Sequence, residues 1–217
     1  MKPRSSNQTN RALTLVEVLV VVAILVVIAA MFLSTLAKAK RKPSRIGCVN
    51  KLKEIGVAYR VWEGDNGDKY PMFVSVTNGG AMELAATGNV VLCFQVMSNE
   101  LSTPQLLHCP EDMAHIETNS FAVLASSNIS YFVGLDARET DPQALLSGDD
   151  NFEIGGVPIK SGLLEISSNT PIAWSAARHK WVGNVLLADG SIQMANNPVL
   201  TNALHQTGLA TNRLAIP

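Results

Sequence analysis

The sequence has few cysteines, and none of them stands in a spacing typical of a zinc or redox motif. Its three cysteines are Cys48, Cys93 and Cys109, and no CxxC or HxxxH pattern occurs. A structural zinc site needs about four ligands at recognisable spacing, so we predict no metal site. The odd count leaves one thiol free if a single disulfide forms, and three buried thiols are the alternative.

The sequence also lacks a motif for nucleophilic catalysis, because no serine or cysteine stands in a recognisable arrangement with a base. The stretch HCPED, residues 108–112, carries metal-capable atoms but not the ligand spacing of a site. Two acidic runs, residues 65–68 and 148–151, supply clustered oxygens. Neither fits the EF-hand spacing, so we expect solvated turns there and keep calcium as an open alternative.

Acidic residues are almost absent from the first quarter of the chain. Residues 1–53 hold ten lysines and arginines and one acid, Glu17, whereas residues 54–217 hold seven basic and seventeen acidic residues. The basic part flanks an apolar segment, so it predicts a membrane-proximal arm and no nucleic-acid binding. No repeat or low-complexity tract occurs, and 217 residues suffice for one domain with an appendage.

The apolar segment covers residues 13–37, with Glu17 as its only charge. As a helix it would be roughly 37 Å long, more than the roughly 30 Å hydrocarbon core of a bilayer. Apolar residues on all its sides predict a membrane span and not a surface helix. A secretory signal peptide has a shorter apolar region and a small-residue cleavage site. The count of basic residues alone would place the C-terminal side in the cytoplasm.

Residues 11–25, RALTLVEVLVVVAIL, resemble the prepilin processing site of type IV pilins and type II secretion pseudopilins. Thr14 and Glu17 match that pattern, whereas Ala12 stands where the family usually has Gly and Leu13 where it usually has Phe. The resemblance implies that a prepilin peptidase cuts between Ala12 and Leu13 on the cytoplasmic side and methylates the new amine. It therefore places the N-terminus in the cytoplasm, against the count of basic residues.

The resemblance also suggests a role for Glu17 in filament assembly. An acid at the centre of a membrane helix costs about 2.5–3.5 kcal/mol on insertion scales. In the related filaments this residue is thought to meet the N-terminal amine of a neighbouring subunit, and such a pair attracts strongly at low dielectric. The alternative is a side chain that snorkels to the membrane interface at modest cost.

A second resemblance covers the rest of the chain. CVNKLKEIGVAYRVWEGDNGDKYP, LLHCPED and SYFVGLDA are similar to landmarks of pilin-like proteins of planctomycete and verrucomicrobial type. HKWVGNVLLADG has the His-x9-Asp-Gly spacing of a prepilin-processing-associated C-terminal domain, with His179, Asp189 and Gly190. We expect structural roles for these three residues, with an acid–base pair as the alternative. The resemblance favours a disulfide between Cys48 and Cys109.

The expected fold is α+β, with the lollipop shape of a pilin. Apolar residues at every third or fourth position predict a helix over residues 44–62, packed on a small antiparallel sheet. Pro43 predicts a kink between this helix and the membrane span. The expected divisions are a leader at 1–12, a membrane helix at 13–37, its continuation at 38–64, and a periplasmic domain at 65–217.

Within the domain we expect a further set of local elements. Asp189 and Gly190 predict a hairpin with a two-residue type I′ turn, and the last residues, 212–217, predict an edge strand closed by proline. The other expected elements are a short helix at 88–101, strands at 106–109, 129–134 and 171–176, and a helix at 197–206.

These patterns predict a pilin-like subunit without catalytic activity or a required cofactor. Its expected partners are the prepilin peptidase, other pilin subunits and an inner-membrane assembly platform. One alternative is a bitopic, membrane-anchored periplasmic binding module that does not polymerise. Another is a membrane-tethered hydrolase built on His179 and Asp189.

Overall fold

The computed structural model describes residues 15–39 and 44–217. The chain divides into two units, Met1–Pro43 and Ser44–Pro217, and each is described by itself. The predicted cleavage site at Ala12 and Leu13, together with Thr14 and the predicted kink at Pro43, lies outside the described residues.

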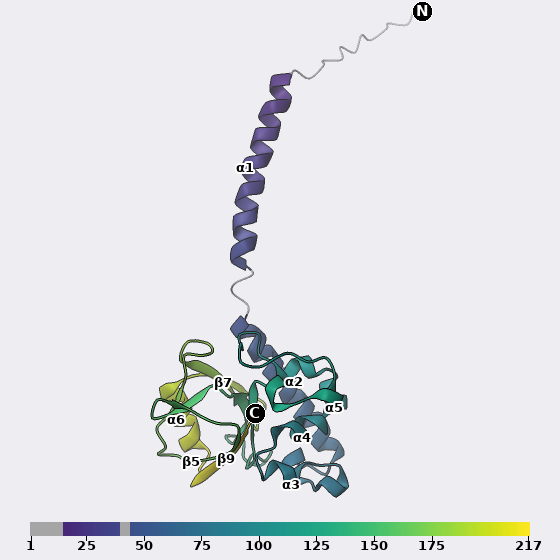
Figure 1. Cartoon of the computed structure of the whole chain (residues 1–217), viewed down its shortest axis with the longest axis vertical. Helices are drawn as coiled ribbons and strands as arrows, with labels where there is room; N and C mark the ends of the chain where they lie inside the picture. Colours follow the sequence, from purple (N-terminus) through teal and green to yellow (C-terminus); the bar gives the residue numbers. More distant parts are fainter. Residues whose placement is uncertain (1–14, 40–43) are drawn as a thin grey trace, which may run out of the picture. The chain divides into compact units, whose positions relative to one another are not determined.

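The described part of the first unit is one helix, α1 (Leu15–Ala39) (Figure 1). Glu17 lies in its first turn, where a negative charge is favourable at the positive end of the helix dipole. The large apolar side chains between residues 15 and 28 are 45–78% exposed. Among the residues that the structure describes, no helix is both long and apolar enough to cross a membrane.

The second unit combines helices with antiparallel sheets, which confirms the predicted α+β class. Its helices are α2 (Ser44–Asp65), α3 (Met82–Ala85), α4 (Val90–Gln95), α5 (Ser98–Leu101) and α6 (Asn197–Gln206), with 3₁₀ turns η1 (Pro71–Phe73), η2 (Val76–Asn78), η3 (Pro104–Leu107), η4 (Phe121–Val123) and η5 (Ser126–Asn128). Its strands are β1 (Tyr131–Gly134), β2 (Leu145–Asp149), β3 (Phe152–Ile154), β4 (Val157–Pro158), β5 (Gly162–Ser167), β6 (Ile172–Trp174), β7 (Val182–Leu187), β8 (Ile192–Asn196) and β9 (Thr211–Ile216).

The strands form two sheets. The larger sheet has the order β5-β9-β1-β2-β7-β8 and the smaller one β4-β3-β6. Alternate residues of the large sheet enter different cores, as the period of two along a strand requires. Tyr131 and Val133 belong to a core shared with α2 to α5, whereas Phe132 belongs to a core shared with α6 and the small sheet. Figure 1 shows α2 to α5 and α6 on opposite sides of the strands.

Helix α2 packs on the first of these cores through a face spaced by three and four residues. Leu52, Ile55, Tyr59 and Trp62 are buried, whereas Val57 on the opposite face is 62% exposed. Gly56 lets the helix approach the sheet closely, because a Cβ there would meet a methyl group of Leu186 at 3.1 Å. The predicted helix over 44–62 is thus present and extends to Asp65.

Two local predictions in the middle of the chain are wrong. The single helix expected over 88–101 is two helices, α4 and α5, separated at Val96 and Met97. The strand expected over 106–109 is absent, because Pro104 opens the 3₁₀ turn η3 there. The Thr103 hydroxyl accepts from the Gln105 N–H and caps this turn, so the two leucines belong to it.

The turn between β7 and β8 also differs from the prediction. The Leu187 N–H donates to the Ser191 carbonyl, and the Gly190 N–H donates to the Leu187 carbonyl, both at 2.9 Å. The loop therefore has three residues, and among them only Gly190 has positive φ, at 83°. This is a type I turn followed by a left-handed glycine, not a two-residue type I′ turn.

The C-terminal strand is not at an edge of the sheet. β9 lies between β5 and β1 and pairs with both. Pro217 follows its last residue, so the missing N–H of proline does not interrupt the ladder. The strands expected at 129–134 and 171–176 and the helix expected at 197–206 are present as β1, β6 and α6.

Candidate functional site

A disulfide joins the first turns of α2 to the segment that follows η3. It connects Cys48 and Cys109, whose Cα atoms are 5.3 Å apart and which are separated by 61 positions in the sequence. Lys51, one turn further along α2, donates to the carbonyls of Gln105 and His108 at 2.6 and 2.8 Å. Helix α2 is therefore tied to this segment by a covalent bond and two hydrogen bonds. Cys93 is free and buried.

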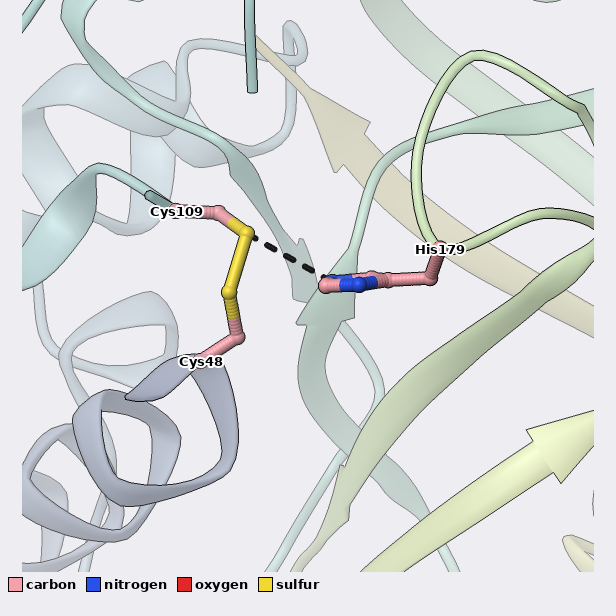
Figure 2. A group of neighbouring side chains, drawn as sticks. All are labelled: Cys48, Cys109 and His179. Carbon is pink, nitrogen blue, oxygen red and sulfur yellow. Dashed lines mark hydrogen bonds between the residues drawn. A yellow bond between two sulfur atoms is a disulfide. The ribbon is translucent and has the colours of Figure 1, made fainter. Parts of the chain in front are cut away.

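His179 lies against this disulfide. Figure 2 shows its imidazole directed at Cys109, with Nε2 3.5 Å from Sγ. The ring is held there by a left-handed loop between β6 and β7, in which His179, Lys180 and Trp181 have φ values of 52°, 54° and 61°. Left-handed backbone is unfavourable for residues with a Cβ, and three in succession without glycine are rare. The loop thus has a strained backbone conformation that places the imidazole in contact with the sulfur.

The other ring nitrogen of His179 faces a carboxylate. Nδ1 is 2.7 Å from Oε2 of Glu111, and Nε2 is 3.6 Å from Oδ2 of Asp149. Within the described residues Nδ1 makes no hydrogen bond despite this short distance. A disulfide sulfur carries no proton, so in the hydrogen bond with Sγ of Cys109 the donor is Nε2. The His179 and Asp149 side chains are fully buried. The sulfur, the imidazole and the Asp149 carboxylate form a buried polar layer, which Glu111 extends to the half-exposed surface.

Arg178 continues this layer through a cluster of buried carboxylates. Its NH2 is 2.6 Å from Oδ2 of Asp112 and 2.5 Å from Oδ1 of Asp150. Its NH1 donates to the Ser130 carbonyl at 2.8 Å and lies 3.7 Å from Oδ1 of Asp149. The guanidinium side chain is only 4% exposed. A guanidinium can serve several carboxylates at once because its donors form a planar fork.

The cluster shifts the pKa values of its members. Burial raises the pKa of Asp150 to about 6 although Arg178 lowers it, and burial likewise raises the pKa of Asp149. For Asp112 the effect of burial is outweighed by the hydrogen bond from His115 and the charge of Arg178, so its pKa lies below the ordinary value. The same hydrogen bond raises the pKa of His115. The carboxylates therefore differ in proton affinity although they share one cation.

Asp189 and Gly190 lie far from this layer. They follow the far end of β7, a strand of six residues that begins just after the His179 loop, so the two ends of the motif are separated by roughly 20 Å of extended chain. Asp189 is exposed and its Oδ1 accepts from the Ser191 N–H at 2.8 Å. The alternative of an acid–base pair between His179 and Asp189 is wrong, because one strand holds them apart.

The acidic run at 148–151 is not a solvated turn. Asp149 is fully buried at the end of β2, and Asp150 and Asn151 are 9% and 8% exposed. Asp149 also accepts from the Asn184 backbone and side chain at 2.8 and 2.9 Å. The sequence of residues 148–151 does not distinguish buried aspartates from solvated ones, because only tertiary contacts bury them. Arg178 was not predicted either, although it directly precedes His179.

Comparison with known proteins adds one match. Residues 7–33 match the model of the prokaryotic N-terminal methylation motif. This motif is a type IV pilin-like prepilin signal, and it contains Ala12, Leu13, Thr14 and Glu17. No curated protein and no solved structure matches the chain.

Proposed function

We propose that this chain is a pilin-like subunit of a type II secretion pseudopilus or a type IV pilus-like filament. In this proposal it is inserted in the inner membrane through residues 13–37, with the N-terminus in the cytoplasm and residues 65–217 in the periplasm. The observation that carries the proposal is the methylation motif over residues 7–33. The His-x9-Asp-Gly resemblance in the second unit supports it.

The proposed maturation is a cut between Ala12 and Leu13 by a prepilin peptidase, followed by methylation of the new amine. Glu17 is then the fifth residue of the mature chain, and it docks on the N-terminal amine of a neighbouring subunit. Each charge offsets the desolvation of the other in a low-dielectric helix bundle. The exposed apolar side chains of α1 are the surface that such a bundle buries.

The second unit has a structural role in this proposal. The disulfide ties α2 to the segment after η3, and His179 packs on the same bond. The assembly platform and the other subunits bind the folded second unit. The subunit carries no catalytic activity of its own.

Mass spectrometry of the membrane-extracted protein tests the maturation. We expect an N-terminus at Leu13 carrying one methyl group when the chain is expressed with a prepilin peptidase. An intact N-terminal segment beginning at Met1 or Lys2 in such cells would refute the processing. Catalytically inactive peptidase is the control, and it should leave the segment uncut.

A substitution of Glu17 tests assembly separately. Glu17→Ala should leave membrane extraction and cleavage unchanged and should reduce filament yield at least tenfold, as measured by shearing and immunoblotting. Glu165→Ala, at an exposed position of β5, is the matched control and should assemble normally. Normal filaments from Glu17→Ala would contradict the docking role.

A further inference from the structure

A cavity of about 420 Å³ opens beside the Arg178 cluster and is separate from the disulfide. Its walls come from the segment after Cys109, from the junction of β2 and β3, and from the loop before His179. The polar part of the lining consists mainly of His115, Asp150, Asn151 and Arg178, and apolar side chains complete it. The imidazole of His115 is the only histidine ring among these lining residues.

The His115 ring is oriented in the way that metal-binding histidines are. Nδ1 contacts Oδ2 of Asp112 at 2.7 Å, and Nε2 lies 3.8 Å from Oδ2 of Asp150. Because the Asp112 carboxylate can only accept, it holds the proton on Nδ1 and directs the Nε2 lone pair toward Asp150. A carboxylate behind the imidazole is the usual arrangement that orients a histidine ligand.

Asn151 supplies an oxygen that nothing in the described residues satisfies. Its Nδ2 donates to the carbonyls of Ser175 and Arg178 at 3.4 and 3.3 Å, which determines the orientation of the amide. Its Oδ1 has no hydrogen-bond partner in the described part of the chain, although the residue is only 8% exposed and lines the cavity. A buried acceptor without a partner costs roughly 1–3 kcal/mol, so a ligand that satisfies it gains that energy.

The charge around the cavity also favours a cation. Asp112, Asp149 and Asp150 are buried around a single guanidinium, that of Arg178. Three carboxylates thus share one guanidinium, and buried carboxylates are costly unless positive groups compensate them.

We propose that His115 Nε2, Asp150 Oδ2 and Asn151 Oδ1 bind a divalent transition-metal ion at the wall of this cavity. Imidazole with carboxylate suits zinc and its neighbours better than calcium or magnesium. At zinc–ligand distances of about 2.0–2.2 Å, two ligands of a tetrahedral site are roughly 3.4 Å apart. The imidazole and the Asp150 oxygen, 3.8 Å apart, therefore need to approach by about 0.4 Å. The cysteine sulfurs take no part, because they are bonded to each other.

Isothermal titration with zinc chloride tests the proposal on the full, oxidised chain in mild detergent at pH 7.5, after removal of metals with a chelator. We expect one zinc ion per chain with a dissociation constant below about 10 μM, and His115→Gln should weaken binding at least tenfold. His205→Gln, at an exposed histidine in the last turn of α6, is the matched control and should bind like the unaltered protein. No binding by the unaltered protein, or equal loss in both variants, would overturn the proposal.

The unaltered protein provides a second measurement that needs no variant. The chain has four histidines, and the ¹⁵N signal of one imidazole Nε2 should shift on addition of zinc while the other three stay in place. Cobalt in place of zinc should give the visible absorption of a tetrahedral site, and Asp150→Asn should reduce it at least fivefold. Cobalt absorption that survives both Asp150→Asn and His115→Gln would place the metal elsewhere and refute the assignment.

Discussion

At the scale of single residues, Arg178 and the carboxylates around it form a buried ionic cluster. One guanidinium contacts Asp112 and Asp150 directly and lies near Asp149, all away from solvent. Removing one partner of a buried ion pair costs about 3–5 kcal/mol, because the remaining charge is left uncompensated. The segment after Cys109, the end of β2 and the loop before β7 therefore pack together only if the Arg178 side chain is present.

Asp150→Asn should change how stability depends on pH. Burial raises the pKa of Asp150 to about 6 in the folded chain, whereas an unfolded aspartate titrates near 3.9. The folded state thus binds the proton more tightly, so the unaltered protein loses stability as the pH rises from 4 through 6. The Asn variant should lack this loss, and its stability relative to the unaltered protein should rise by about 1–3 kcal/mol over that range.

Urea denaturation at several pH values, in buffer with a chelator, measures this difference. Arg178 and Asp112 also face the carboxyl group and are present in both proteins. His115 contributes to the difference as well, because the charge of Asp150 helps to raise its pKa and is absent from the variant. Asp141→Asn, at an exposed position, is the control and should follow the unaltered protein. A pH-independent difference between the Asp150→Asn variant and the unaltered protein would show that Asp150 does not titrate in this range.

At the scale of elements, two connections meet at the disulfide that anchors α2. The disulfide ties the helix to the segment after η3, and the left-handed loop before β7 places His179 in contact with the Cys109 sulfur of that disulfide. Such strain persists only where surrounding contacts over-determine the path. The buried Arg178 and His179 side chains are the anchors that do so here.

Loss of the disulfide should destabilise the domain substantially. The bond closes a loop between residues 61 positions apart, which corresponds to about 4 kcal/mol in the chain-entropy model. The double variant Cys48→Ser with Cys109→Ser should therefore unfold at a clearly lower urea concentration than the unaltered protein. Equilibrium unfolding followed by tryptophan fluorescence is the measurement.

Cys93→Ala is the matched control for this experiment. Cys93 is as buried as the bonded pair but makes no disulfide, so its truncation removes only packing and should cost about 1 kcal/mol. A double serine variant no less stable than Cys93→Ala would contradict the role assigned to the bond.

At the scale of the whole molecule, the two units differ in where their apolar side chains lie. Every buried core residue of the described chain is at position 48 or later, whereas the large apolar side chains of α1 between residues 15 and 28 are exposed. The second unit thus has its own core, as an independently folding domain requires.

A chain reduced to Ser44–Pro217 should fold by itself. We expect a cooperative thermal transition within about 5 °C of the full chain in the same detergent, because no core residue is removed. A chain reduced further to residues 66–217 is the control. It lacks Cys48, Leu52, Ile55 and Tyr59 and should give no cooperative transition by calorimetry. Failure of the longer chain to fold would mean that residues before Ser44 are needed for the fold.

The sequence by itself determined the elements whose cause is local. The face of α2 follows from apolar residues at helical spacing, and α6 follows from the Asn196 cap with proline in the first turn. The methylation motif is likewise a contiguous pattern that can be recognised without a fold. In each case residues within a few positions of one another supply the physical reason.

Only the tertiary structure decided the burial of Asp149 and Asp150, the inner position of β9 and the contact of His179 with Cys109. That contact joins residues 70 positions apart, and no local pattern encodes which distant side chain a loop will reach. An aspartate can lie in a solvated turn or be buried beside a guanidinium, and the presence of that cationic partner decides which of the two occurs. The His-x9-Asp-Gly pattern likewise does not show that its two ends are far apart. They are separated because the residues between them form the extended strand β7.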